Sequence, residues 1–135
     1  MKKTIGAAII MIALFTLILS SCSSKEEADG NETVYRQISQ EEAKKMMEKD
    51  DGHIIVDVRR EDEFAQGHIP NAICIPNESI DTREPKELPD KDQIILVYCR
   101  SGNRSKQAAE KLAKLGYRNV YEFGGIIDWT GEIVK

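Results

Sequence analysis

One segment of the chain reads Ile94-Ile95-Leu96-Val97-Tyr98-Cys99-Arg100-Ser101-Gly102-Asn103-Arg104. Its first four residues form a continuous apolar run, which is typical of a strand buried on both faces of a parallel sheet. Helical periodicity follows over 105–115 and stops at Gly116, a residue type common just after helix ends. The segment therefore predicts a strand, a short loop and a helix, with Cys99 at the carboxyl end of the strand.

Similar elements alternate along the rest of the domain. Apolar runs predict four more strands, at 34–38, 54–58, 72–75 and 120–123. Helical patterns lie at 39–50 and 60–66, and a last helical turn is expected at 126–129. The connections are a polar surface segment with one helical turn at 77–92 and a turn at 124–125. This alternation predicts an α/β fold, an open, mostly parallel five-stranded sheet with helices on both faces.

The start of the chain has the pattern of an exported protein. Two lysines precede an uncharged apolar run over 5–19, which is shorter than the roughly 20 residues of a membrane span and fits a cleavable signal peptide. The adjoining Leu19-Ser20-Ser21-Cys22 resembles the bacterial lipoprotein box. We expect a lipoprotein signal peptide over 1–21 and a lipid on Cys22 that holds the protein at the extracytoplasmic face of a bacterial membrane. An ordinary signal peptide and an uncleaved anchor are the alternatives.

The remaining length and charge limit the possible functions. Residues 22–33 are polar without apolar periodicity, which predicts a flexible tether, and 34–135 suffice for one compact domain but not two. The net charge is −4 and becomes more negative without the two N-terminal lysines, which argues against a nucleic-acid partner. The sequence has neither clustered cysteine and histidine ligands nor a Gly-Lys-Ser phosphate motif, so we expect no metal and no cofactor.

Two cysteines belong to the predicted domain. Cys74 lies in the apolar run 72–75 and is expected to be a small core residue, with a resolving thiol for Cys99 as the alternative. Cys99 instead begins a loop at the carboxyl end of a strand, where open α/β sheets bind their ligands. Cys99 is therefore the candidate nucleophile.

The loop after Cys99 has the composition of an anion site. Its backbone N–H groups can form an anion-binding nest, with Gly102 easing the turn, and the following helix adds its positive end. Both effects favour a thiolate without a histidine base, and the chain has only two histidines. Arg100 and Arg104 add donors that suit an oxyanion substrate.

Three segments carry a more specific pattern. They are Asp57-Val58-Arg59 with Glu63-Phe64 and 67–72, then 99–105, then Gly124-Gly125 with Trp129. In this order they resemble the single-domain rhodaneses, also called thiosulfate sulfurtransferases. The resemblance covers 34–135 and implies the rhodanese fold, an α/β sheet of about five strands.

The resemblance also implies covalent sulfur transfer. Cys99 would attack the outer sulfur of a donor such as thiosulfate, and the resulting persulfide would give its sulfur to cyanide, a thiol or a protein acceptor. The active-site loop would consist of Arg100, Ser101, Gly102, Asn103 and Arg104. Arg104 would either touch substrate or pair with a carboxylate such as Asp57. Asp57 and Arg59 lie at the end of a strand and are expected to form a buried ion pair that supports the loop, with a catalytic role as the alternative.

Two other functions compete with this enzyme. The same cysteine could carry persulfide or sense oxidants for a partner protein with little turnover. A phosphatase or arsenate reductase is disfavoured because four residues separate Cys99 from Arg104, one fewer than in protein tyrosine phosphatases. Two further residues are expected to be structural. His68 fixes its own turn by a local hydrogen bond, with a catalytic role as the alternative, and Trp129 is a core residue, with a binding platform as the alternative.

Overall fold

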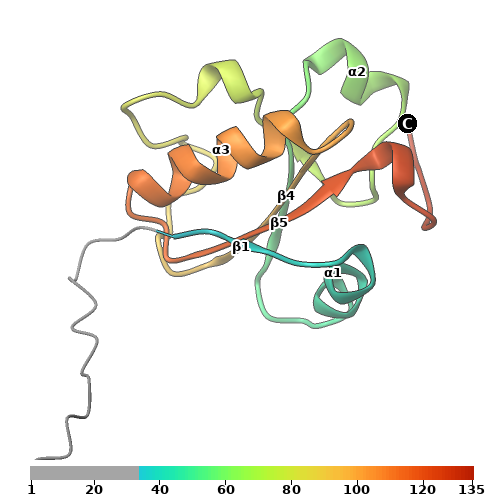
Figure 1. The fold of residues 1–135 in the computed structure, drawn as a ribbon, viewed down its shortest axis with the longest axis horizontal. Coiled ribbons are helices and arrows are strands. Elements are labelled where there is room, and N and C mark those ends of the chain that lie inside the picture. The colour runs from blue at the N-terminus through green and yellow to red at the C-terminus, as the bar shows by residue number, and fades with distance from the viewer. Residues whose placement is uncertain (1–33) are drawn as a thin grey trace, which may run out of the picture. The chain divides into compact units, whose positions relative to one another are not determined.

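The structure is a computed structural model, and it describes residues 34–135. The predicted signal peptide, Cys22 and the predicted tether lie outside the described residues. The elements follow the predicted alternation (Figure 1). In chain order they are β1 Arg36–Gln37, α1 Gln40–Met47, β2 Ile54–Asp57, α2 Glu61–Gln66, β3 Ile73–Cys74, the 3-10 turn η1 Asn77–Ser79, β4 Ile94–Cys99, α3 Asn103–Lys114, β5 Asn119–Gly125 and the 3-10 turn η2 Ile126–Asp128.

The five strands form one sheet in the order β1-β5-β4-β2-β3. Every ladder in this sheet is parallel, so the predicted five-stranded sheet is confirmed and the described sheet is more regular than "mostly parallel". The apolar run at 94–97 forms the central strand, because a strand with neighbours on both sides must bury both of its faces. The central position places the carboxyl end of β4 in the middle of the row formed by the carboxyl ends of the five parallel strands.

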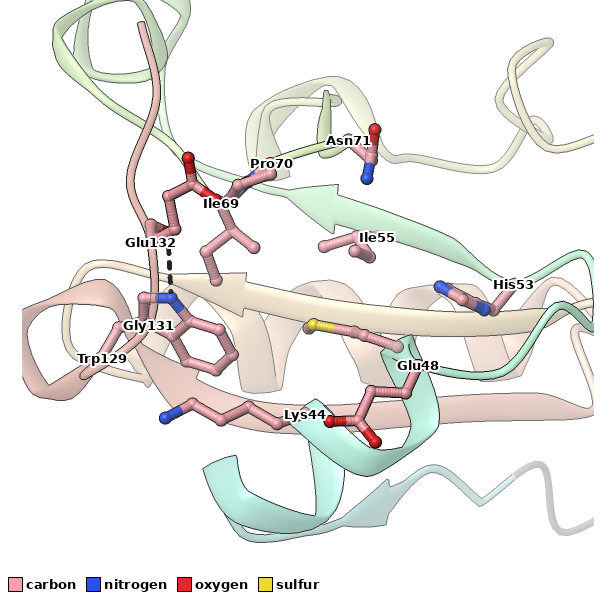
Figure 2. A pocket seen from close by; sticks show the side chains of 11 residues that line it. Lys44, Glu48, His53, Ile55, Ile69, Pro70, Asn71, Trp129, Gly131 and Glu132 are labelled. Carbon is pink, nitrogen blue, oxygen red and sulfur yellow. Dashed lines mark hydrogen bonds between the residues drawn. The ribbon is translucent and has the colours of Figure 1, made fainter.

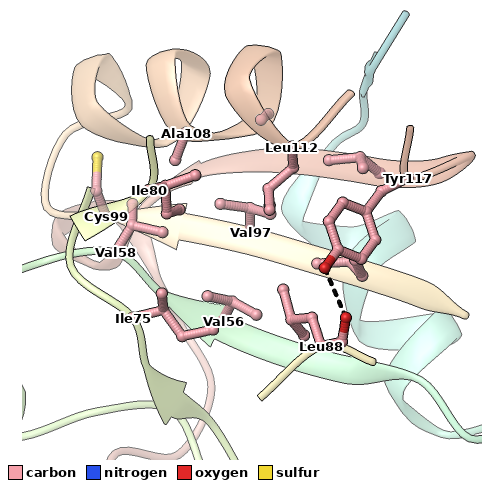
Figure 3. Close-up of a cluster of buried hydrophobic side chains, with 13 residues drawn as sticks. Val56, Val58, Ile75, Ile80, Leu88, Val97, Cys99, Ala108, Leu112 and Tyr117 are labelled. Carbon is pink, nitrogen blue, oxygen red and sulfur yellow. Dashed lines mark hydrogen bonds between the residues drawn. The ribbon is translucent and has the colours of Figure 1, made fainter. Parts of the chain in front are cut away.

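Side chains along β4 alternate between two cores, one on each face of the sheet. Ile95, Val97 and Cys99 face the side covered by α3, where they pack with Leu112 and its neighbours (Figure 3). Leu96 and Tyr98 face the other side, where Ala43 of α1 joins their cluster. Helices on both faces are therefore confirmed (Figure 1).

Several boundaries differ from the sequence prediction, and two of the differences concern glycines near Cys99. Helix α3 begins at Asn103 and not at 105, because Gly102 adopts the left-handed conformation, with a φ of +106°, and serves as its N-cap. Gly124-Gly125 was predicted as a turn but continues β5. Within 34–135, no helix combines the length and apolar character needed to cross a bilayer.

Candidate active site

The Cys99 thiol lies at the carboxyl end of β4, beside the first turn of α3 (Figure 3). Only 1% of Cys99 is exposed. The backbone N–H of Gly102 donates to its Sγ over 3.0 Å, and Sγ lies 3.3 Å from the hydroxyl oxygen of Ser105. An N–H aimed at sulfur stabilises the thiolate more than the thiol, and the N-terminus of the 12-residue helix α3 adds a partial positive charge.

The arginines of the loop have different surroundings. Arg104 forms a two-pronged ion pair with Glu63 of α2, with Nη1 2.7 Å from Oε2 and Nη2 3.0 Å from Oε1. The Arg104 guanidinium lowers the pKa of Glu63 to about 2, so this pair is charged at neutral pH. Of the two alternatives for Arg104, the structure shows pairing with a carboxylate, although the carboxylate is Glu63 and not Asp57. Arg100 is exposed.

Asp57 and Arg59 form a second ion pair at the end of β2. The Arg59 Nη2 atom lies 2.7 Å from Oδ2 of Asp57, and the exposed fractions of the two side chains are 8% and 0%. The same Nη2 donates to the carbonyl of Gly67 over 2.7 Å. The pair therefore ties β2 to the turn after α2. Its predicted support of the 99–104 loop stays a prediction.

A buried network below the thiol was missed by the sequence analysis. The Ser105 hydroxyl lies 2.7 Å from Oε1 of Glu122 and 2.9 Å from the carbonyl of Gly102. Glu122 is 3% exposed, and the N–H of Gly124 donates to the same Oε1 over 2.8 Å. A glutamate inside the apolar strand 120–123 was the one signal of this network in the sequence.

The family model described as a rhodanese-like domain matches residues 39–132. The chain belongs to the rhodanese family. It is 38% identical over 80 residues to the thiosulfate sulfurtransferase PspE of Escherichia coli, covering 59% of this chain and 77% of PspE. It is 36% identical over 97 residues to the thiosulfate sulfurtransferase GlpE of Coxiella burnetii, covering 71% of this chain and 88% of GlpE. YrkF of Bacillus subtilis is 34% identical over 108 residues, which cover 79% of this chain but 57% of YrkF.

Solved structures give the same family. A rhodanese with anions from Escherichia coli is 36% identical, has a TM-score of 0.57, and is matched over 62% of this chain and 98% of its own. A rhodanese-like domain protein from Staphylococcus aureus is 34% identical, has a TM-score of 0.61, and is matched over 72% of this chain and 93% of its own. The chain is thus a sulfurtransferase of the rhodanese family.

In this rhodanese domain, β5 passes directly beneath the active-site loop at Gly125. A Cβ on Gly125 would lie 2.0 Å from the carbonyl oxygen of Arg100 and 2.6 Å from Cα of Ser101. The N–H of Ile127 also donates to the Arg100 carbonyl over 3.2 Å, which fixes the loop against η2. Ser101 and Asn103 are exposed.

Replacing Gly125 with alanine is expected to displace the loop, because the clash is with backbone and no rotamer relieves it. A displacement of about 1 Å in reacting groups can cost roughly a hundredfold in rate. We expect Gly125→Ala to lower the sulfurtransferase kcat by about that factor. Gly52→Ala is the control, because its added methyl group meets no atom within 4 Å and leaves only backbone strain at a φ of +76°. Equal kcat values for the two variants would contradict this explanation.

Cys74 was predicted to be a core residue, and that prediction is wrong. It lies on β3, an edge strand, where it is half-buried as a free thiol, and burial followed by the nearby Asp57 charge raises the pKa of Cys74 to about 11. The strand β2 separates it from β4, a spacing of roughly 10 Å between strand axes. That spacing exceeds the reach of a disulfide without backbone movement, so the fold as described does not favour Cys74 as a resolving thiol for Cys99.

One groove on the described part of the chain does not have Cys99 among its lining residues. It has a volume of about 410 Å³ and lies between α1, 69–71 and the C-terminal segment, on the α1 face of the sheet (Figure 2). Trp129 was predicted to be a core residue. It packs on Phe123, but it is only half-buried and forms a wall of this groove, with its Nε1–H donating to the Glu132 carbonyl.

The prediction for His68 is confirmed. Its Nδ1 lies 3.0 Å from the Phe64 carbonyl and its ring stacks on that of Phe64. Its backbone forms a bridge with Val134, so the turn is fixed from both sides. Within 34–135, no three acidic, histidine or cysteine side chains lie close enough together to hold a metal ion.

Proposed function

We propose that this chain moves a sulfane sulfur from an anionic donor such as thiosulfate to cyanide or a thiol through a persulfide on Cys99. The observation that supports this most directly is the Gly102 N–H aimed at Sγ over 3.0 Å at the head of α3. The same arrangement can hold the extra sulfur of a persulfide, since its terminal sulfur is also an anion. The names of the relatives PspE and GlpE support thiosulfate as the donor.

The reaction has two half-reactions that balance without an oxidant. In the first, the Cys99 thiolate attacks the outer sulfur of thiosulfate, a new sulfur–sulfur bond forms on Cys99, and sulfite leaves with the electron pair of the old bond. In the second, cyanide or a thiolate attacks the terminal sulfur of the persulfide. The bond to Cys99 breaks, and its electron pair regenerates the Cys99 thiolate.

The two arginines of the loop have different roles in binding the donor. Arg104 is already paired with Glu63, whereas Arg100 is exposed on the loop. Arg100 is therefore the cation that attracts the anionic donor. The short gap between Cys99 and Arg104 favours a sulfane sulfur over the larger phosphoryl group.

Mass spectrometry after thiosulfate treatment tests the proposal. The full-length chain should gain the mass of one sulfur on the peptide that contains Cys99, and cyanide should remove it within seconds to minutes while thiocyanate appears. A chain that gains the sulfur but loses it to neither cyanide nor thiols would be the persulfide-carrying module. A chain that gains no sulfur and instead releases phosphate from an aryl phosphate would be a phosphatase.

We propose further that Cys22 carries the lipid and that the domain lies at the extracytoplasmic face of a bacterial membrane. The support is the order of charged, apolar and small residues that ends at Cys22. Cys22→Ala should move the protein from the membrane fraction to the soluble fraction of a bacterial host. Membrane association that Cys22→Ala leaves unchanged would contradict the lipoprotein assignment.

A further inference from the structure

Glu122 is a buried acid for which the sulfur-transfer steps have no use. It lies on β5 with 3% of its surface exposed. Its Oε1 accepts hydrogen bonds from the Gly124 N–H and the Ser105 hydroxyl. Among residues 34–135, no lysine, arginine or histidine nitrogen is paired with it. Buried acids usually have a cationic partner, so this one calls for another explanation.

The Ser105 hydroxyl joins this acid to the candidate nucleophile. Its oxygen is 3.3 Å from the Cys99 Sγ on one side and 2.7 Å from the Glu122 Oε1 on the other. A hydroxyl has one proton to donate and two lone pairs to accept with. The geometry therefore permits a continuous chain in which the Cys99 thiol donates to Ser105 and Ser105 donates to Glu122.

The two arginines near this chain differ in their surroundings. Arg104 of α3 is paired with Glu63 of α2. This pairing is the main cause of the raised pKa of Arg104, with smaller contributions from Cys99 and from Glu78 of η1. Arg100 is exposed to solvent. A thiolate on Cys99 and a carboxylate on Glu122 would thus be two negative charges separated by one hydroxyl, an arrangement in which full ionisation of both is unfavourable.

We infer that Cys99 and Glu122 share one proton through Ser105, and that Glu122 is a positioning residue that sets when Cys99 becomes a thiolate. As the thiol S–H bond breaks, its proton passes to the Ser105 oxygen and the Ser105 hydroxyl proton passes to the Glu122 Oε1. The bonding electrons stay on the Cys99 sulfur, which then accepts from the Ser105 hydroxyl and the Gly102 N–H. The inference rests on the proposed function, in which Cys99 is the nucleophile.

The test is the pH dependence of alkylation of Cys99 by iodoacetamide in the full-length chain, measured by peptide mass spectrometry. The wild-type rate should rise in two steps, because the first proton lost leaves one charge divided between sulfur and carboxylate, and the second leaves against that charge. In Glu122→Gln the rate should rise in one step, about one pH unit or more below the upper wild-type step. Alkylation between those two pH values should then be up to roughly tenfold faster in Glu122→Gln.

Glu110→Gln is the matched control, because Glu110 is an exposed glutamate of α3 that pairs with Lys114. It should keep the two-step wild-type profile. A single step in the wild-type chain overturns the shared proton, and this result needs no variant to fold. Coincident profiles for the wild type and Glu122→Gln overturn it as well.

Thiosulfate loading of the same samples separates the two proposals. If the wild type gains sulfur but shows a single alkylation step, the shared proton is wrong and the sulfurtransferase proposal stands. If the wild type shows two steps and Glu122→Gln one, but no sample gains sulfur, the shared proton stands and the proposed function is wrong.

Discussion

Replacing Cys99 with serine should lower the turnover of thiosulfate and cyanide on the order of a thousandfold or more, as loss of a covalent nucleophile does in other enzymes. A serine hydroxyl is not ionised at neutral pH, and the loop holds no histidine base to activate it. The Gly102 N–H and the α3 N-terminus would remain but would have no anion to stabilise. Thiocyanate formation measures the loss, and mass spectrometry should find no added sulfur.

Cys74→Ser is the matched control, because it makes the same change on the edge strand β3. Burial and Asp57 raise the pKa of Cys74 to about 11, so that thiol is almost entirely protonated at neutral pH and should contribute nothing to turnover. Cys74→Ser should therefore retain wild-type turnover. If Cys99→Ser retains a tenth of the activity, or if Cys74→Ser loses most of it, Cys99 is not the sulfur carrier.

Replacing Arg59 with methionine should lower the free energy of unfolding by about 3–5 kcal/mol, the range seen when one partner of a buried ion pair is removed. The variant keeps an unbranched side chain, although a shorter one. It leaves the Asp57 carboxylate without its cation, and the Asp57 side chain is completely buried. It also removes the donor to the Gly67 carbonyl. Urea unfolding at neutral pH measures the change.

Two further variants show whether the buried charge is the cause. Asp57→Asn combined with Arg59→Met removes both charges and should be more stable than Arg59→Met alone. Arg118→Met breaks an ion pair with Asp92 whose side chains are 64% and 71% exposed, and it should leave the unfolding free energy nearly unchanged. Equal losses in Arg59→Met and Arg118→Met would rule out the buried charge as the cause.

The fold could be predicted from local patterns because its central strand is an apolar run and the helix after it has clear apolar periodicity. The run at 94–97 is apolar on both faces, and only a central strand buries both faces. The exceptions arise where tertiary contacts override local preference. Gly124-Gly125 has the composition of a turn but lies in β5, because the active-site loop passes so close that position 125 has no room for a side chain.

The candidate site could be predicted only where it is contiguous in sequence. The loop 99–104 is one segment, so its composition indicated the nucleophile and the anion nest directly. Its partners come from other elements, and pairing between distant segments leaves no local pattern. Glu63 pairs with Arg104 across 41 residues, and Glu122 bonds to Ser105 across 17. A glutamate on a short charged helix gave no sign that it would hold the loop.

The order of the strands also determines when the nucleophile is assembled during biosynthesis. Strand β1 pairs with β5, and Arg36 and Tyr121 at that junction are 85 residues apart. The first of the described strands can therefore pair with β5 only after the last one has been made, and contacts between residues so far apart in sequence favour slow folding. Glu122 and Gly125 arrive on that last strand. A nascent chain thus contains Cys99 before β5, which packs against the active-site loop, has been made. The site is completed only when β5 joins the sheet.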